Sequence, residues 1–403
     1  MADFDLLLRG GHVIDPVNRL DEVMDVGISG SRISAVASHL DAGAVQSIDM
    51  QGRYVVPGLI DMHVHVYPRS TVDGPAALVP DAHAFRVGVT TLVDAGTAGS
   101  NDFADFRANW IERSSVRLLA WINIAAAGMG NAEQDPRQFD IQKLVDTLAA
   151  NSDVAVGVKT AHYWTRLAWD AEHPPWASVD AAVEAGERAH LPIMVDFWPR
   201  PPERPYADLI LQHMRPGDIH THVFAQQFPI VTEEGGVYDH LWRARERGVL
   251  FDLGHGAGSF WFRNAVPALA AGFPPDSIST DLHLRSLNGA ALDTLHCVSK
   301  CIAMGMPIAE AIYRTTVTPA RAIRRPELGT LSPGAEADVA VLRWVNQPRS
   351  FADCGRARLQ GQGELACDMT LRAGRIVWDP TGLSMPEWTS APAAYWNIPA
   401  LQS

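Results

Sequence analysis

Between Pro57 and about Arg325, short apolar segments alternate with longer stretches in which apolar residues recur at helical spacing. This alternation is typical of a parallel β-sheet built from strand–helix units. The apolar segments lie at residues 58–66, 88–96, 116–125, 154–160, 191–197, 218–224, 249–256 and 277–283. Eight parallel strands in roughly 270 residues favour a closed (β/α)8 barrel over an open, doubly wound sheet.

Apolar segments punctuated by glycine at both ends of the chain indicate a second, smaller β domain. Residues 1–56 have the pattern of short strands and turns, and the same pattern returns in residues 326–380. We expect these two regions to form one β-sandwich, with the barrel of residues 57–325 inserted between them. The predicted fold class is therefore α/β, a TIM-like barrel with a small β-sandwich. Residues 381–403 form a tail without a clear period, which we expect to cover the barrel or a neighbouring subunit.

Composition and charge indicate which binding partners and which cellular compartment to expect for the protein. The 403 residues carry a formal net charge of -13 and contain no run of Lys or Arg, which argues against nucleic acid and anionic membranes as partners. No apolar stretch approaches the roughly 20 residues that cross a bilayer, and the first residues are acidic rather than basic. Four cysteines form no disulfide framework in a chain of this size. We expect a cytoplasmic protein.

Side chains that bind metal ions recur where the predicted strands end. The carboxyl ends of the strands carry the active site in barrels of this type. The residues at these ends are His63 and His65, Lys159, Asp196, His222, His255, and Asp281 with His283. One His-x-His pair is a weak signal, but ligand-type residues at six strand ends predict a metal centre. Imidazole nitrogen and carboxylate oxygen favour zinc, manganese, cobalt or iron over calcium and magnesium.

Strand alternation predicts which of these histidines face the same way. Residues two apart in a strand point to one face, so His63 and His65 can both face one cation. The same rule puts His220 and His222 on a shared face, with Thr221 on the other. We expect His220 to lie one pleat deeper, as a buried structural histidine.

Lys159 needs a separate interpretation, because an ammonium group cannot bind a cation. It is either a structural ion-pair partner or, after reaction with carbon dioxide, a carbamate. The carbamate is an anion whose two oxygens suit a bridge between two metal ions.

Several of these segments together resemble the amidohydrolase superfamily, in particular its dihydroorotase-like or deacetylase-like branch. The similar stretches include "GLIDMHVHV", "VGVKT", "DIHTHVF", "ISTDLH" and, near the end, "GTLSPGAEADVAVL". The resemblance implies two divalent ions, with zinc favoured. It implies His63 and His65 on the first ion, carboxylated Lys159 between both, His222 on the second, and Asp281 on the first ion as the catalytic acid and base.

The chain departs from the family pattern at Asp196, where the family usually has histidine. Asp196 either binds the second metal through oxygen or points away, and we favour binding. In the former case the centre is less positive and acidifies its water less, which favours activated carbonyls such as esters or strained rings.

The expected substrate pocket departs from the pattern too. Dihydroorotases have an arginine two residues after the His-x-His pair, where this chain has Tyr67. Arg69 or Arg200 can take over its contact with a substrate carboxylate, or both are solvated loop residues. Trp198 and its neighbours predict a bulky, partly aromatic pocket, and His162 and Tyr163 are weaker substrate-binding candidates. His255 and His283 either polarise the scissile carbonyl and bind the leaving group, or orient the metal ligands.

These features predict a metal-dependent hydrolase of a small molecule, of the deacetylase or amidase type. The scissile bond is an amide, including a cyclic amide or imide, and a metal-bound hydroxide attacks it. One alternative is a carboxylic esterase or lactonase with the same site. An alternative of another class is a barrel that has lost catalysis and serves as a scaffold. We expect a homo-oligomer.

Overall fold

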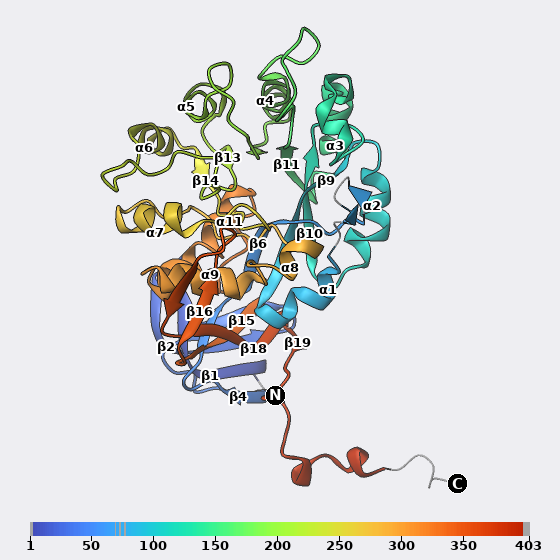
Figure 1. The fold of residues 1–403 in the computed structure, drawn as a ribbon. Coiled ribbons are helices and arrows are strands. Elements are labelled where there is room, and N and C mark those ends of the chain that lie inside the picture. The colour runs from blue at the N-terminus through green and yellow to red at the C-terminus, as the bar shows by residue number, and fades with distance from the viewer. Residues whose placement is uncertain (1–2, 69, 72–73, 76–77, 398–403) are drawn as a thin grey trace.

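The computed structural model describes residues 3–68, 70–71, 74–75 and 78–397. A barrel of parallel strands and surrounding helices makes up the larger part, and a sheet formed by both ends of the chain lies beside it (Figure 1). The predicted α/β architecture is thus confirmed.

Seven parallel strands form most of the barrel wall. In spatial order, which is also chain order, they are β6 (Leu59–Val64), β9 (Val89–Gly99), β10 (Arg117–Asn123), β11 (Ala155–Thr160), β12 (Ile193–Val195), β13 (Ile219–His220) and β14 (Leu250–Phe251). Each lies mainly or wholly within one of the first seven apolar segments of the sequence. All residues of β6, β9 and β11 are buried, as expected for strands covered on both faces.

The eighth predicted segment closes the barrel without forming a continuous strand. Leu282 makes a parallel bridge to Val64 of β6, and Ser277 makes one to Asp252 just after β14. The backbone N–H of Asp281 also donates to the carbonyl of His63 at 2.7 Å. Residues 277–283 therefore join the two edges of the seven-stranded sheet, and the closed barrel is confirmed.

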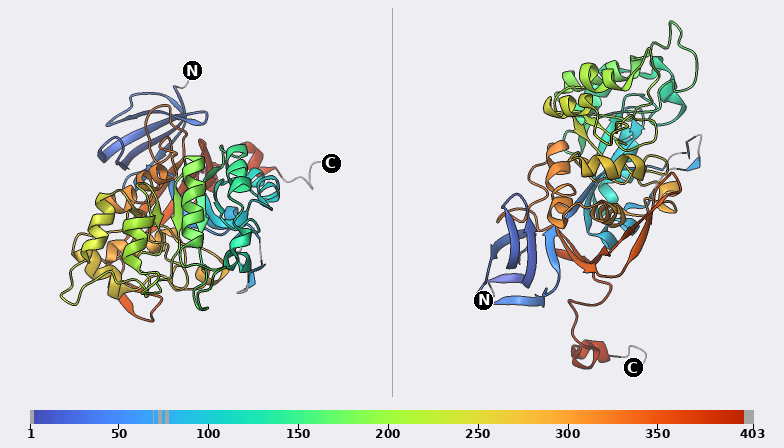
Figure 2. Two further views of the ribbon diagram at one scale, coloured as in Figure 1. Left: turned by 90° about the horizontal axis from the view of Figure 1, so that it is seen from above. Right: turned by 60° about the vertical axis from the view of Figure 1, so that its left-hand side comes forward.

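Helices cover the outside of the barrel and one of its ends (Figures 1 and 2). They are α1 (Pro80–His83), α2 (Phe103–Asn109), α3 (Ile141–Ala150), α4 (Ala177–Ala189), α5 (Tyr206–Asp208), α6 (Asp239–Glu246), α7 (Phe262–Ala270), α8 (Leu284–Leu287), α9 (Thr294–Ala303), α10 (Ile308–Tyr313) and α11 (Val317–Ala322). Inside the barrel, Met62, Trp121 and Met194 pack with Ala320 of α11 and Ile323. This core fills one end of the barrel, so the strand ends that carry the polar residues surround the remaining space.

Strands from both ends of the chain share one mixed sheet. It contains β1 (Phe4–Asp15), β2 (Leu20–Ser29), β3 (Arg32–Ala37), β4 (Ala44–Asp49), β5 (Tyr54–Pro57), β15 (Val339–Val345), β18 (Glu364–Arg372) and β19 (Arg375–Trp378). Two short hairpins, β7 (Ser70–Thr71) with β8 (Gly74–Pro75) and β16 (Arg349–Ala352) with β17 (Arg358–Gly361), stand apart from it. Antiparallel pairing of β5 with β15 joins the two ends of the chain, and Leu8, Ile28 and Met369 belong to a core separate from the barrel.

After Ser384, whose carbonyl accepts a hydrogen bond from Gln46, the described part of the C-terminal tail extends away from the body of the molecule (Figure 1 and the right view of Figure 2). Trp388, Tyr395 and Trp396 are 62%, 61% and 52% exposed. The expectation that the tail covers its own barrel is therefore wrong for these residues, and contact with a neighbouring subunit remains a prediction. Among the residues that the structure describes, no helix combines the length and apolar character that crossing a bilayer requires.

Candidate metal centre

A cavity of about 660 Å³ opens at the carboxyl ends of the barrel strands. The predicted ligand-type residues that line it are His63, His65, Lys159, Asp196, His222 and Asp281. They come from the ends of β6, β11, β12 and β13 and from the closing segment, so the fold brings together residues far apart in the sequence. Four of the six, all but Asp196 and Asp281, are less than a tenth exposed.

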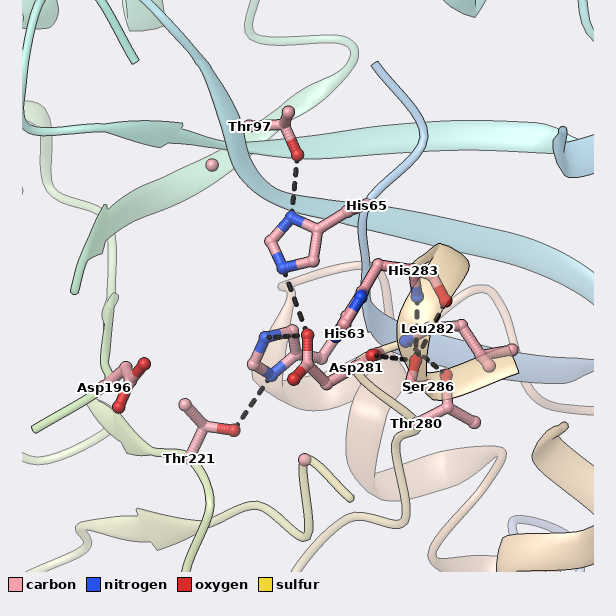
Figure 3. A network of polar contacts seen from close by, with 12 residues as sticks. His63, His65, Thr97, Asp196, Thr221, Thr280, Asp281, Leu282, His283 and Ser286 are labelled. Atoms are coloured by element: carbon pink, nitrogen blue, oxygen red, sulfur yellow. Dashed lines mark hydrogen bonds and ion pairs between the residues drawn. The ribbon is translucent and has the colours of Figure 1, made fainter. Parts of the chain in front are cut away.

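His63, His65 and Asp281 converge on one point (Figure 3). Asp281 Oδ1 lies 3.5 Å from His63 Nε2 and 3.1 Å from His65 Nε2. Two ligand atoms bound to one tetrahedral zinc at about 2.0–2.2 Å stand about 3.4 Å apart. The predicted shared face of His63 and His65 is confirmed, because both imidazoles lie near the same Asp281 oxygen, and these two distances fit ligands of a single cation.

A buried chain of hydrogen bonds sets the orientation of His63. Its Nδ1 lies 2.9 Å from Thr221 Oγ1, and that hydroxyl donates to Asp252 Oδ2 at 2.7 Å. Asp252 also accepts from Ser277 and Ser279, so its carboxylate is held by three hydroxyls. Because the Thr221 hydroxyl hydrogen is committed to Asp252, His63 Nδ1 is the donor to Thr221, which leaves Nε2 unprotonated and able to bind a cation.

Two more buried carboxylates hold the backbone around the centre. Asp94 accepts the backbone N–H groups of Val66 and Thr97, and the Thr97 hydroxyl lies 2.7 Å from His65 Nδ1. Asp61 accepts from both the backbone N–H and the hydroxyl of Thr280, next to Asp281. No motif in the sequence distinguishes these acids or Asp252 from other buried residues, and their roles emerge only from the folded register.

Lys159 is buried beside the same point. Its Nζ lies 3.3 Å from His63 Nε2 and 3.6 Å from Met194 Sδ. Burial lowers the pKa of this amine, and burial together with the Lys159 charge lowers the pKa of His63 to about 3. Lys159 has no ion-pair partner within the described chain, so the structural ion pair that the sequence left open is absent there.

Asp196 lies between two imidazoles on the opposite side of the cavity. Its Oδ2 is 3.6 Å from His222 Nε2 and 3.6 Å from His162 Nε2. Burial alone would raise the pKa of Asp196. The charges of His222 and His162 outweigh burial and bring this pKa well below its usual range. Asp196 thus faces the cavity rather than away from it.

The donor atoms fit a divalent transition metal. One candidate ligand atom from each of His63, His222 and Asp281 lies within 4.8 Å of the others. Imidazole nitrogen with carboxylate oxygen is the donor set of many zinc sites. The histidines' Nδ1 atoms have protein partners, with the His222 Nδ1 bonded to the Gly254 carbonyl, and their Nε2 atoms face the cavity side of the cluster.

Strand alternation does not continue beyond the end of β13. The prediction that His220 and His222 lie on the same face of the strand is therefore wrong. His220 is buried, as expected, but its ring packs outside the barrel wall against Tyr206, Phe228 and Phe251. His222 has a left-handed backbone with φ of 63°, which breaks the two-residue repeat. Thr221, expected on the other face, is the residue that contacts His63.

Most of the predicted substrate-binding side chains do not line the cavity. Tyr67 donates to Asp105, Tyr163 donates to the Pro174 carbonyl, and Arg200 stacks over Trp169 while donating to the Trp164 carbonyl. Trp198 is 43% exposed at the surface. The bulky aromatic pocket is therefore absent from the described residues, because these side chains contact other residues outside the cavity or lie at the surface. His162 does line the cavity, and Arg69 lies outside the described residues.

The two remaining histidines differ in position. His283 lines the cavity near His65, with its Nδ1 accepting the Arg285 backbone N–H at 3.2 Å. His255 does not line it: its ring stacks on Phe260, and its Nε2 lies 2.7 Å from the buried Lys300 Nζ. A direct contact of His255 with substrate therefore lacks support.

Sequence reasoning missed several cavity residues that follow the third, fourth and seventh strands. Glu133 is buried, and its carboxylate accepts from Asn123 at 2.8 Å and from the Gly130 N–H at 2.9 Å. Burial raises the pKa of Glu133. Arg166 and Ser259 also line the cavity. These residues stand in loops well beyond their strands, where no spacing rule relates them to the metal ligands.

Comparison with known proteins agrees with this architecture. A model described as the amidohydrolase family matches residues 300–378. A deacetylase of Brucella anthropi is 32% identical over 336 residues, which cover 81% of this chain and 81% of the relative. Among solved structures, an adenine deaminase has a TM-score of 0.85 at 26% identity, covering 94% of this chain and 100% of that one. A dihydroorotase has a TM-score of 0.78 at 27% identity, covering 93% and 99%.

These similarities are not confined to one motif. The structural matches cover 94% and 93% of this chain, so they take in the barrel together with strands of the terminal sheet. The deacetylase match covers 81% of each chain at 32% identity, which indicates common ancestry over most of both proteins. The chain therefore belongs to the amidohydrolase superfamily of metal-dependent hydrolases, in the branch represented by its deacetylase and dihydroorotase relatives.

Proposed function

We propose that this protein hydrolyses the amide bond of a small molecule, including cyclic amides and imides, in a reaction of the deacetylase or amidase type. One observation carries the proposal: six ligand-type side chains from four strand ends and the closing segment line a single cavity. The deacetylase relative supports the same bond class.

We propose a pair of zinc-type ions, with manganese, cobalt and iron as alternatives. His63, His65 and Asp281 would hold the first ion, and His222 with Asp196 the second. Lys159 as a carbamate would bridge them. The modification would also replace a buried ammonium, which has no carboxylate partner among the described residues, by a ligand anion. When bound, such ions acidify water and polarise a carbonyl oxygen.

Two side chains of the cavity have proposed roles in proton transfer and in substrate contact. Asp281 is the proposed proton acceptor from the attacking water and the donor to the leaving amine, because its carboxylate lies at the centre of the ligand cluster. His283 would contact the carbonyl or the leaving group, since its Nδ1 is engaged by the backbone and its ring lines the cavity.

Ester or lactone hydrolysis is the second candidate, and Asp196 favours it. A carboxylate in place of a neutral imidazole adds one negative charge to the second metal position. A less positive centre acidifies water less, which suits carbonyls that are easier to attack than amides.

Parallel kinetics would test the proposal. An N-acyl amino acid, a cyclic imide and an O-acyl hydroxy acid would be assayed with zinc-loaded enzyme and with enzyme stripped by a chelator. We expect turnover of the first two classes that disappears on stripping and returns with zinc. Preference for the O-acyl compound would favour the esterase, and a purified protein that binds no metal and turns over none of the compounds would favour the scaffold.

We further propose that the enzyme acts in the cytoplasm as a homo-oligomer. All four cysteines are unpaired, as expected in a reducing compartment, and the aromatic tail suits a contact with a second copy. Light scattering on the purified full chain would give the subunit number.

A further inference from the structure

We infer that His162 is a ligand of the second metal ion, where it completes a set of two imidazoles and one carboxylate with His222 and Asp196. This inference rests on the proposed function, because it concerns the same metal centre. His162 follows β11 by two residues, at the start of the loop that leads toward α4. It would supply the nitrogen that is missing because residue 196 is an aspartate.

The two distances that join Asp196 to the imidazoles are close to those of ligand atoms on one cation. Its Oδ2 is 3.6 Å from the Nε2 of His162 and 3.6 Å from the Nε2 of His222. These separations exceed the roughly 2.7–3.2 Å of a nitrogen–oxygen hydrogen bond. They match the separation of about 3.4 Å between two ligands of one tetrahedral zinc.

Both imidazoles have the nitrogen that a metal needs. The Nδ1 of His222 bonds to the Gly254 carbonyl, which leaves its Nε2 as the lone-pair nitrogen. The His162 ring has no hydrogen bond within the described chain, and its side chain is 61% exposed. His162 therefore has the freedom for the short rotation that would bring Nε2 to coordination distance.

The backbone at His162 is fixed even though its ring is free. Gln134, another cavity residue, donates from Nε2 to the His162 carbonyl at 2.6 Å and accepts the Trp164 N–H at 2.8 Å. This double contact holds the turn that carries the imidazole. A ring on a fixed backbone loses little conformational entropy when it binds a cation.

His162 also shares an uncommon backbone conformation with two of the proposed ligands. The φ angles of His162, His222 and Asp281 are 55°, 63° and 48°. Such left-handed conformations cost energy in residues other than glycine and gather at functional sites. All three residues stand just beyond the wall of the barrel, at the cavity, so the same local turn directs a polar side chain inward in each case.

The proposed ligands of the second ion are of the types that zinc binds in proteins, imidazole nitrogen and carboxylate oxygen. Asp196, His222 and the bridging Lys159 carbamate would provide only one imidazole to the second ion, and His162 would add another, so that nitrogen and oxygen ligands are balanced as in many zinc sites. The carboxylate pairs with the charge of the ion, and two neutral imidazoles leave its Lewis acidity largely intact.

Metal titration of the full-length apoprotein tests the inference without relying on activity. Zinc chloride binding would be measured by equilibrium dialysis with elemental analysis, and cobalt chloride binding by visible absorption. We expect two equivalents in the wild type. In His162→Ala and in His162→Gln we expect an unchanged first equivalent, a second equivalent weakened by about tenfold or more, and a changed cobalt spectrum for the second ion alone.

His283→Ala is the matched control, because it removes another imidazole from the same cavity, away from Asp196. We expect it to keep the second equivalent. Wild-type affinity for the second equivalent in both His162 variants would overturn the inference. So would loss of both equivalents in both variants, which would indicate a structural role, or an equal loss in His283→Ala.

The titration separates this inference from the proposed function. If the wild type hydrolyses amides with one tightly bound ion and has no second site, the inference fails and the hydrolase stands. If the second ion depends on His162 but no amide, imide or ester is turned over, the inference stands and the proposed function fails.

Discussion

In the proposed mechanism Asp281 has two roles, because it binds a cation and also transfers a proton. Burial raises its pKa, but His63 and the other imidazoles outweigh burial and keep the pKa well below its usual range. The carboxyl group is therefore ionised at neutral pH, as a proton acceptor must be.

Asp281→Asn keeps the shape of the side chain and removes its basicity. We expect kcat/KM to fall by about 10²–10⁴-fold, the usual contribution of a general acid–base group, with part of the loss arising from weaker metal binding. Steady-state kinetics normalised to bound zinc would separate the two effects. A variant that retains wild-type kcat per bound ion would contradict this role.

Asp252 acts on the centre through Thr221, which orients His63. Asp252→Asn would replace an acceptor of three hydroxyl protons by a group that accepts through one oxygen, and would free His63 to turn. Loss of such partners costs about 10–100-fold in metal affinity, measurable by zinc titration. Ser277→Ala removes one hydrogen bond to Asp252 without touching Thr221 and is expected to keep the affinity within about threefold, because the network to His63 remains. Equal affinities in both variants would contradict the role of Asp252.

At this scale the sequence predicts which candidate ligands line the cavity better than it predicts the residues that orient them. His63 and His65 were predictable because a strand repeats every two residues. His222 was found at the right strand end, but the orientation of its neighbours was wrong because its φ is positive. Asp252, Asp94 and Glu133 were not predictable, since a buried acid has no sequence signature apart from the partners it meets in the fold.

At the scale of single elements, β9 and β11 illustrate how strand packing sets the site. Gly96 in β9 has φ of 76°, and a Cβ there would lie 2.5 Å from the Cβ of Lys159. The close approach of these two strands requires glycine. Lys159 owes its position to this missing side chain as much as to its own strand.

Gly96→Ala would therefore displace Lys159. We expect a loss of stability of about 1–3 kcal/mol from overpacking and the unfavourable φ, together with weaker metal binding. Gly235→Ala is the matched control, because Gly235 has φ of 85° and open space around its Cβ. Chemical denaturation and zinc titration of both variants would check this. Equal metal affinity in the two would contradict the packing account.

The elements of the barrel were largely predictable, because parallel strands covered on both faces appear as continuous apolar runs. Except for β9, the assigned strands are shorter than those runs, and β13 and β14 comprise two residues each. The reason is that residues after the last ladder bond turn toward the cavity to carry the polar groups. For the same reason, the closing segment 277–283 pairs with its neighbours through isolated β-bridges rather than a continuous ladder. The sequence predicts that this segment closes the barrel, but it does not predict the irregular backbone.

At the scale of the whole molecule, buried histidines make stability depend on pH. Burial and the Lys300 and Arg349 charges lower the pKa of His296 to about 3, and its Nδ1 has no hydrogen-bond partner in the described structure. An unfolded chain has a histidine pKa of about 6.5. Between these two values the unfolded state binds more protons, so the free energy of unfolding decreases as the pH falls below about 6.5.

His296→Leu isolates this contribution from those of other groups. From pH 7 to pH 5 the metal-free wild type should lose about 2 kcal/mol more stability than the variant. Urea unfolding at both pH values would give the difference. An identical pH dependence in the two proteins would contradict the assigned pKa shift.

Metal removal should lower the stability of the whole molecule, because the proposed ligands come from strands around the barrel. Binding to the folded state alone stabilises it by about 4 kcal/mol at a free metal concentration 1,000 times Kd. We expect the melting temperature to fall on chelation and to recover with zinc. A melting temperature that does not change on chelation would contradict the proposal that a metal centre links these strands.

The most direct test of the central claim is anomalous diffraction from crystals of the zinc-loaded, active protein, recorded on both sides of the zinc absorption edge. The account predicts a peak within coordination distance of His63 Nε2, His65 Nε2 and Asp281, and a second beside Asp196 and His222. An active protein without anomalous density among these side chains would contradict it.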